Sequence, residues 1–294
     1  MELTAVELER LSEVIARRSG LVFSEARWPF LRRRARAVMA REGFTSGSCW
    51  TTELDRAAGR GASLYAELEA ALHVHETSFF RYPGHHEALR DVVLPAVVAE
   101  RSRRRAEAGA AASARPGERL RIWSVGCSTG EEPYSLAMTV RESLPPDVPV
   151  EILAVDVSHD ALRAAALGQY RAAEVAAVPP GLLARYFRNG GEAWTVDAGL
   201  RDIVRFVHYD VRHGLYAGKF DVIVCCNVLL YFTAAVKRDV LTRLAGSLRP
   251  GGYLFLGHAD GATPPAAHFD VRRSPHGFIY RRRATATTRV ELGE

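Results

Sequence analysis

The stretch that decides the fold is Arg121-Ile-Trp-Ser-Val-Gly-Cys-Ser-Thr-Gly-Glu-Glu-Pro-Tyr-Ser-Leu-Ala-Met138. It begins with a short apolar run, passes through a loop bounded by Gly126 and Gly130, and continues with apolar residues at helical spacing after Pro133. This order predicts a strand, a glycine turn and a helix. Glycines in such a turn let the backbone adopt positive φ and approach a ligand, and the helix that follows begins with unpaired N–H groups. The stretch therefore predicts a nucleotide-like ligand.

Acidic residues around this turn indicate which nucleotide. Glu131 and Glu132 fall in the first turn of the helix, where they would repel a pyrophosphate but favour a ligand that carries an ammonium and a sulfonium. The next apolar run, residues 151–155, ends in Asp156, whose carboxylate can accept both hydroxyls of a ribose. Together these acids indicate S-adenosylmethionine. A glycine turn alone is weak support, however, and first-turn acids are also ordinary partners of the helix dipole.

Composition limits the class of protein. With 294 residues and 48% hydrophobic content, the chain can bury one sizeable core and still form a smaller domain. No apolar run reaches the roughly 18 residues of a membrane span, and the first residues lack the features of a signal peptide, so we expect a cytoplasmic protein without membrane insertion. The four cysteines have no metal-ligand spacing, so we expect reduced, packed thiols and no metal site.

The charge distribution suggests an acidic partner. A net charge of +5 and a pI near 9.2 would by themselves favour nucleic acid. However, the only lysines are Lys219 and Lys237, and so strong a preference for arginine is typical of codon bias; we expect no nucleic-acid binding. One arginine cluster without any acid exceeds this background: Arg27, Arg32, Arg33, Arg34, Arg36 and Arg41. It is either a solvated helix face or a docking surface for an acidic partner.

The chain divides into segments of different pattern. Residues 1–73 show helical spacing throughout, with a helix that Gly20 ends and another that Pro29 begins, and predict a small all-helical domain. Residues 74–119 form a link that contains a helix at about 86–100 and a low-complexity run from Arg101. Residues 120–283 alternate strands with helices, as in a doubly wound α/β domain, and residues 284–294 form a tail.

Three polar residues follow apolar runs of the α/β domain. Asp156, Asp210 and Asn227 each end such a run, and ligands bind at the carboxyl ends of parallel strands. We therefore expect the three side chains to converge near the glycine loop, although each alone could be a turn or a helix cap. Between these runs, residues 170–200 break the alternation with a short helix, a turn and a strand-like piece, which predicts a small hairpin insert at about residues 180–203.

Three segments resemble the chemotaxis receptor methyltransferases, the CheR family: Glu76-Thr-Ser-Phe-Phe-Arg81, Trp123 to Met138, and Phe220-Asp-Val-Ile-Val-Cys-Cys-Asn-Val-Leu-Leu-Tyr-Phe232. The resemblance extends from residue 5 to about residue 281. It implies a protein-glutamate O-methyltransferase that uses S-adenosylmethionine, or holds S-adenosylhomocysteine as product. It also implies a helical N-terminal domain, a Rossmann-like doubly wound catalytic domain and a small β-subdomain. The implied substrates are glutamates in the cytoplasmic region of chemoreceptors, and a monomer is expected.

The resemblance also implies the site residues. Those expected at the cofactor are His75, Thr77, Arg81, Gly126, Glu131, Glu132, Asp156, Asp210, Val211, Cys226 and Asn227. Arg81 is the candidate catalytic residue, because a guanidinium can hold the carboxylate of the acceptor or of the donor. No general base is expected, since a glutamate with a pKa of about 4.3 is already ionised at pH 7. For receptor docking we expect Arg32, Arg33 and Arg36.

Three positions depart from the family pattern. His75 stands where the family usually has Asn, Asp210 where Asn is usual, and Cys226 where Arg commonly precedes Asn227. Asp210 keeps hydrogen-bond acceptors but loses donors, and Cys226 loses a positive charge. Two alternatives therefore stay open: a module that binds S-adenosylmethionine without turnover, and a methyltransferase that acts on another substrate. It is also open whether the insert docks a receptor tail or is a packing flap.

Overall fold

The computed structural model describes residues 3–56, 58–74, 76–107, 119–214 and 218–284. The chain forms two compact units. The smaller comprises Met1–His75 with Leu229–Lys237, and the larger comprises Glu76–Val228 with Arg238–Glu294. None of the helices in the described ranges combines the length and the apolar character needed to cross a membrane.

In its described residues the smaller unit contains the helices α1 (Ala5–Ser19), α2 (Trp28–Arg41), α3 (Gly47–Leu54) and α4 (Arg60–Leu72), with a short 3-10 turn, η1 (Glu25–Arg27). A capping box between Thr4 and Glu7 begins α1, and Gly20 ends it with a φ of 71°. The apolar faces pack into one core that includes Leu11, Leu31, Trp50, Leu64 and Leu68. Residues 229–237 contribute η4 (Leu229–Tyr231) and the start of α11 (Ala234–Ser247) to this unit.

The larger unit contains a seven-stranded sheet with strand order β6-β2-β1-β7-β8-β10-β9. The strands are β1 (Leu120–Val125), β2 (Val150–Asp156), β6 (Val204–His208), β7 (Phe220–Cys225), β8 (Leu248–Leu256), β9 (Phe269–Ser274) and β10 (Gly277–Arg282). The first five in the order are parallel, and β10 and β9 complete the sheet as antiparallel strands. The predicted Rossmann-like α/β class is confirmed, whereas β9 was not predicted.

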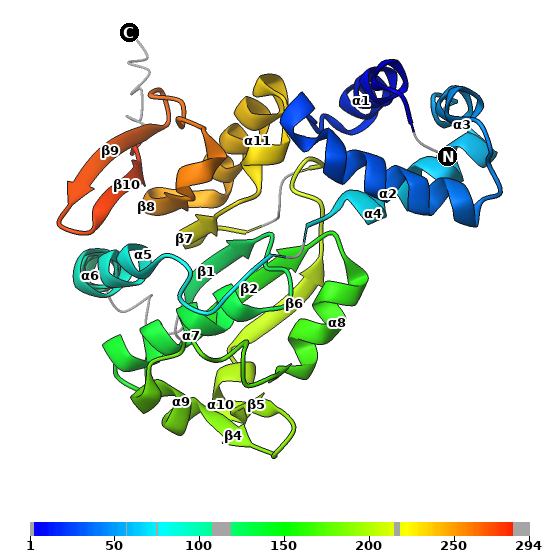
Figure 1. Cartoon of the computed structure of the whole chain (residues 1–294). Coiled ribbons are helices and arrows are strands. Elements are labelled where there is room, and N and C mark those ends of the chain that lie inside the picture. The colour runs from blue at the N-terminus through cyan, green and yellow to red at the C-terminus, as the bar shows by residue number, and fades with distance from the viewer. Residues whose placement is uncertain (1–2, 57, 75, 108–118, 215–217, 285–294) are drawn as a thin grey trace, which may run out of the picture. The chain divides into compact units, whose positions relative to one another are not determined.

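Helices cover both faces of the sheet, as a doubly wound fold requires. Figure 1 shows α5 (Pro83–Ala88), α6 (Leu94–Glu107), α7 (Glu131–Ser143) and α8 (His159–Leu167) on one side of the sheet and α11 on the other. A π-helical segment, η2 (Leu89–Val93), joins α5 to α6, so the predicted helix at 86–100 lies inside a longer one. Ser158 caps α8 and Gly168 ends it.

The insert is a separate small sheet with strand order β3-β5-β4. Its strands are β3 (Gln169–Tyr170), β4 (Phe187–Asn189) and β5 (Trp194–Val196), accompanied by α9 (Pro180–Tyr186) and α10 (Ala198–Arg201). The predicted hairpin is present as β4 and β5, which pair antiparallel. The third strand, β3, lies before residue 180, so the insert begins earlier in the chain than the sequence pattern indicated.

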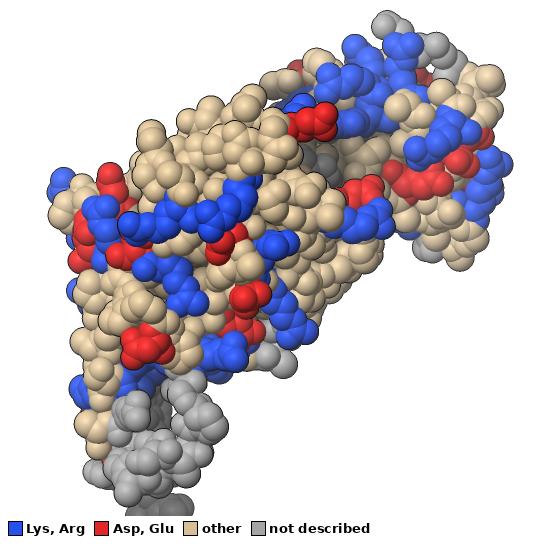
Figure 2. Space-filling view, turned by 90° about the horizontal axis from the view of Figure 1, so that it is seen from below, with Lys and Arg blue, Asp and Glu red and all other residues tan. Residues whose placement is uncertain are grey.

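Arginines on the surface are commonly paired with acids. Ion pairs such as Arg41 with Glu67 at 2.5 Å and Arg185 with Glu142 at 2.6 Å recur over both units. Figure 2 shows acidic side chains interspersed among the basic ones over much of the face in view. Much of the positive charge that the composition records is therefore compensated locally.

Candidate active site

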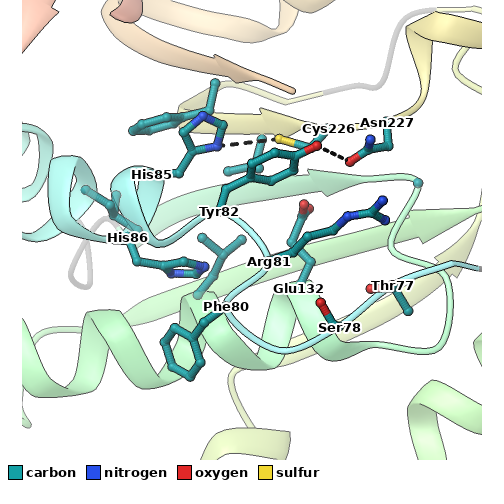
Figure 3. A pocket seen from close by; sticks show the side chains of 15 residues that line it. Thr77, Ser78, Phe80, Arg81, Tyr82, His85, His86, Glu132, Cys226 and Asn227 are labelled. Carbon is teal, nitrogen blue, oxygen red and sulfur yellow. Dashed lines mark hydrogen bonds between the residues drawn. The ribbon is translucent and has the colours of Figure 1, made fainter. Parts of the chain in front are cut away.

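A hollow in the larger unit lies at the carboxyl ends of β1 and β7, where ligands of open α/β sheets bind. Six of the residues predicted from the sequence line it: Thr77, Arg81, Gly126, Glu132, Cys226 and Asn227. Figure 3 shows them with side chains that the sequence pattern did not indicate, among them Phe80, Tyr82, His85 and His86. Polar groups gather on one side of the hollow and aromatic rings on the other.

The glycine loop has the backbone that the sequence predicted. Gly126 and Gly130 have φ angles of 73° and 99°, which glycine adopts without strain. A Cβ atom at Gly126 would lie 2.4 Å from Cγ2 of Val228, so this position has no room for a side chain. The backbone N–H groups of Gly126 and Cys127 both donate to the carbonyl oxygen of Val155, at 2.8 and 2.9 Å, and this anchors the loop on β2.

Asp156 lies against the glycine loop at the end of β2. Its Oδ2 accepts a hydrogen bond from the backbone N–H of Ser128, and its Oδ1 accepts one from the N–H of Ser158, both at 2.9 Å. A carboxylate oxygen can accept more than one hydrogen bond, so both oxygens keep capacity for ribose hydroxyls. Asp156 is nearly buried and does not itself line the hollow around Arg81.

The two acids of the α7 first turn have different surroundings. Glu132 opens onto the hollow, and the hydroxyl of Ser124 donates to its Oε1 at 2.7 Å. Burial raises the pKa of Glu132 to about 7, although the Ser124 hydrogen bond opposes this shift. The carboxylate of Glu131 instead accepts a hydrogen bond from the Thr129 hydroxyl at 2.8 Å, and burial raises its pKa. Glu131 does not line the hollow. Glu132 is therefore the carboxylate that can meet a ligand ammonium here.

Arg81 and Thr77 come from the segment that precedes α5. The Arg81 guanidinium donates to the carbonyl oxygen of Glu76 and forms a long ion pair, 3.5 Å, with the carboxylate of the same residue. Because Glu76 is exposed, this pair is weak, and a ligand carboxylate can compete for the guanidinium. The predicted site residue His75, which precedes this segment, lies outside the described residues.

Cys226 faces a histidine rather than a charge. Its Sγ lies 3.6 Å from Nδ1 of His85, as Figure 3 shows. Burial raises the pKa of Cys226 well above its usual value, and burial, with His258 nearby, lowers the pKa of His85 to about 4. Both groups are therefore neutral near pH 7. His85 therefore supplies no positive charge beside Cys226.

Asp210 and Val211 lie apart from the hollow. Burial would raise the pKa of Asp210, but hydrogen bonds and the charge of Arg212 outweigh it and lower the pKa. The Arg212 guanidinium contacts both carboxylate oxygens, at 2.6 to 3.0 Å, and His213 lies 3.1 Å away. Val211 is buried. The expected convergence thus joins Asn227 and Gly126 at the hollow and Asp156 at the adjacent loop, while Asp210 faces its own arginine.

The predicted docking arginines share one surface in the smaller unit. Arg32, Arg33 and Arg36 line an open hollow on α2 together with Pro29. Arg41, from the same cluster, is engaged with Glu67. No group of three or more His, Cys, Asp or Glu residues within the described ranges could hold a metal ion, and the four cysteines are free thiols.

The fold and the site together define a Rossmann-like S-adenosylmethionine-dependent methyltransferase. Beside the glycine loop, the carboxylate after β2 suits the ribose of that cofactor, the acid at the hollow suits its ammonium, and the guanidinium suits its carboxylate. The model of the family "CheR methyltransferase, SAM binding domain" matches residues 75–278. The chain belongs to this CheR methyltransferase family.

Named relatives match along most of the chain. Chemotaxis protein methyltransferase 1 of Pseudomonas aeruginosa is 37% identical over 219 residues, which are 72% of this chain and 75% of the relative. Chemotaxis protein methyltransferase Cher2 of Pseudomonas putida is 29% identical over 94% of this chain and 97% of its own length. Chemotaxis protein methyltransferase 2 of Vibrio cholerae is 32% identical over 92% of this chain and 91% of its own length.

Proposed function

We propose that this protein transfers the methyl group of S-adenosylmethionine to glutamate side chains in the cytoplasmic region of chemoreceptors, and that it acts in the cytoplasm. Membership of the CheR family and the names of the relatives support the reaction class. The observation that carries the proposal is the hollow beside the glycine loop, where Glu132 and Arg81 place one negative and one positive group at the same ligand site.

In this proposal each end of the cofactor has its own partner. The two carboxylate oxygens of Asp156, each of which already accepts a hydrogen bond from one backbone N–H, accept further hydrogen bonds from the ribose hydroxyls. Glu132, when ionised, holds the ammonium of the methionine end. Arg81 holds either the carboxylate of the same end or the carboxylate of the acceptor glutamate, because its planar fork matches both. When bound, S-adenosylmethionine supplies a methyl group on a positively charged sulfur.

The reaction needs no general base from the chain. The acceptor glutamate is ionised at neutral pH, and its oxygen attacks the methyl carbon while the bond from that carbon to sulfur breaks. Opposite charges cancel as this happens, so a site that excludes water favours the transition state over the separated ions. The contribution of the protein is then to hold the two reactants in line, which can supply several kcal/mol, about 7–11 in well-oriented intramolecular cases.

Helix α2 is the proposed contact with the receptor. Its hollow is lined by Pro29, Arg32, Arg33 and Arg36, so three guanidinium groups gather there. A chemoreceptor segment that contains methylatable glutamates is acidic, so the charges are complementary. Such complementarity chiefly sets the association rate and the register of docking.

A transfer assay tests the proposal. The full-length protein is incubated with tritium-labelled S-adenosylmethionine and purified cytoplasmic fragments of candidate receptors. We expect label on glutamates that mild base releases as methanol, because carboxylate methyl esters are base-labile. Label on RNA or a small molecule instead of carboxylates would contradict the proposed substrate. Binding of S-adenosylhomocysteine without transfer to any receptor would favour the alternative, a binding module weakened by Asp210 and Cys226.

A further inference from the structure

Asn227, which follows β7 at the hollow, is held from two directions. Its φ of 61° is left-handed, a conformation that asparagine adopts more readily than most other non-glycine residues. Its backbone N–H donates to Oδ2 of Asp260 at 3.0 Å. Its side-chain Oδ1 accepts from the hydroxyl of Tyr82 at 2.7 Å, as Figure 3 shows.

Asp260 joins the ends of two neighbouring strands. It is the last residue of a short turn, η5 (His258–Asp260), that follows β8, and it is fully buried. The oxygen that accepts from Asn227 also accepts from the backbone N–H of Gly257 at 2.9 Å. A carboxylate that accepts two N–H groups in a buried place forms strong, charge-assisted hydrogen bonds. One oxygen atom thus fixes the ends of β7 and β8 relative to each other.

Gly257 lies where the three groups meet. A Cβ atom at this position would lie 2.9 Å from Oδ2 of Asp260, 3.0 Å from the nitrogen of Asn227 and 3.2 Å from the Tyr82 hydroxyl. A side chain there would push the groups apart. The network therefore depends on a glycine whose φ is ordinary, and the reason for the glycine is space rather than backbone conformation.

The Tyr82 hydrogen bond decides which way the Asn227 amide points. A side-chain amide offers one accepting oxygen and one donating NH2 group. With Oδ1 occupied by Tyr82, the NH2 group remains, and it donates to none of the residues that the structure describes. The natural partner of such a donor beside Arg81 is a carboxylate oxygen. Both the methionine end of the cofactor and the acceptor glutamate carry one.

We infer that Tyr82 and Asp260 are positioning residues that hold Asn227 so that its side-chain NH2 group binds a ligand carboxylate in the hollow. This inference rests on the proposed function in one respect only, namely which of the two carboxylates is bound. Tyr82 sets the amide orientation, and Asp260 sets the backbone from which the amide projects.

The Tyr82→Phe variant tests the first half. It keeps the ring that stacks on His85, with centroids 5.0 Å apart, and removes only the hydroxyl. We expect the Kd for S-adenosylhomocysteine, measured by calorimetry on the full-length chain, or the KM for a receptor fragment, to rise roughly five- to tenfold. The matched control is Tyr186→Phe, which removes a hydroxyl bonded to Glu142 at 2.6 Å outside the hollow and should change neither quantity.

A double-mutant cycle separates positioning from a general structural role. Asn227→Ala alone should cost about as much as Asn227→Ala combined with Tyr82→Phe, because Tyr82 acts through Asn227. A change in the Kd for S-adenosylhomocysteine would show that the NH2 group of Asn227 binds the carboxylate at the methionine end of the cofactor. A change confined to the receptor KM would show that it binds the carboxylate of the acceptor glutamate. Additive losses, or no change in either quantity, would overturn the inference. A wild-type chain that binds S-adenosylhomocysteine but methylates no receptor would contradict the proposed function, while the cycle could still be measured by binding.

Asp260 variants test the second half. Asp260→Asn keeps an oxygen that can accept both N–H groups, so we expect a Kd within about threefold of wild type, whereas Asp260→Ala should raise the Kd at least as much as Tyr82→Phe. Equal losses in Asp260→Asn and Asp260→Ala would refute the role of the accepting oxygen. If Asp260→Ala does not fold, retention of affinity by Asp260→Asn still supports that role, and its loss in a folded Asp260→Asn protein refutes it.

Discussion

Three non-glycine residues in the described part of the chain have positive φ, and all three lie at the candidate site. They are Phe80 at 52°, Ser128 at 49° and Asn227 at 61°. This conformation costs roughly 1–2 kcal/mol for Phe80 and Ser128, whereas asparagine tolerates it better. In each case the backbone N–H of the residue donates a hydrogen bond to a side-chain oxygen. The acceptors belong to Ser135, Asp156 and Asp260, respectively. The shape of the site is therefore held by specific hydrogen bonds between backbone and side chains, as is typical of functional sites.

Asp156→Asn tests the ribose contact. An amide has one accepting oxygen where the carboxylate has two, so one of the N–H groups of Ser128 and Ser158 would face an NH2 group. We expect the affinity for S-adenosylhomocysteine to fall by about tenfold or more, since hydrogen bonds to a charged group contribute about 1.5–3 kcal/mol. Calorimetry gives the Kd, and the variant should still show wild-type far-UV circular dichroism. An unchanged Kd would exclude Asp156 from the cofactor site.

Glu132 makes cofactor affinity depend on pH. Burial raises its pKa to about 7, so the carboxyl is ionised at pH 8 and mostly protonated at pH 6. Only the ionised form attracts an ammonium, and we expect the affinity for S-adenosylhomocysteine to fall about tenfold from pH 8 to pH 6. Glu132→Gln should bind weakly at both pH values and lose this dependence. An equally steep dependence in Glu132→Gln would assign the titration to another group.

At the residue scale, the sequence predicted the positions but not their partners. Polar residues after apolar runs identified Asp156 and Asn227, because strand ends are recognisable from hydrophobic pattern. Tyr82 is 145 residues from Asn227 along the chain, and Asp260 is 33 residues from it, so no local pattern connects them. The engagement of Asp210 by Arg212 could have been suspected, since the two are only two residues apart.

The glycine turn is the element on which we expect cofactor binding to depend most. Gly126→Ala would place a Cβ 2.4 Å from Val228 on a backbone with φ of 73°. We expect a loss of roughly 1–3 kcal/mol in the free energy of unfolding and a loss of measurable binding of S-adenosylhomocysteine. Gly191→Ala is the control, because Gly191 has a φ of 89° with nothing within 4 Å of a Cβ. The Gly191→Ala variant should have the same kind of backbone strain but should bind S-adenosylhomocysteine normally. Equal losses of binding in both variants would show that the effect does not arise in the glycine turn.

Helix α2 is expected to affect receptor methylation but not cofactor binding. Arg33→Glu combined with Arg36→Glu reverses the charge of the hollow on α2, and docking of an acidic segment should weaken at least tenfold, as a rise in the receptor KM. The Kd for S-adenosylhomocysteine should not change. Arg272→Glu with Arg273→Glu makes the same change of charge on exposed residues of β9 and serves as control. Wild-type receptor KM in the α2 variant would contradict the docking role.

Elements with a regular pattern could be predicted, and irregular ones could not. The core strands β1, β2 and β7 are apolar runs because both faces of the sheet are covered. The edge strand β9 is paired on one side only and carries Arg272 and Arg273, so it lacks that signal. The start of β8 is irregular too, because Leu248 pairs with Phe220 while Tyr253 pairs with Val222, which leaves a register shift between them.

At the scale of the whole molecule, the alternation of strands and helices was sufficient to predict the doubly wound class. What alternation does not encode is the order in which strands assemble, or that β10 pairs antiparallel with β8 and β9 pairs antiparallel with β10. The net charge of +5 was equally uninformative by itself, because its meaning depends on which arginines have acidic neighbours in the folded chain.

The two compact units predict a selective response to ligand. All residues that line the cofactor hollow belong to the larger unit. S-adenosylhomocysteine at about 100 times its Kd should stabilise that unit by about 2.7 kcal/mol. For a unit of this size the unfolding midpoint should rise by roughly 5–10 °C in differential scanning calorimetry. A ligand-induced shift confined to the unfolding of residues 3–74 would contradict this placement of the site.

The central claim is that one hollow beside the glycine loop holds the cofactor. A crystal structure of the full-length protein with S-adenosylhomocysteine tests it most directly. We expect the ligand along residues 126–130, with its ribose hydroxyls on Asp156 and its amino group on Glu132. A ligand bound elsewhere, or a bound ligand that leaves both Asp156 and Glu132 without contact, would contradict it.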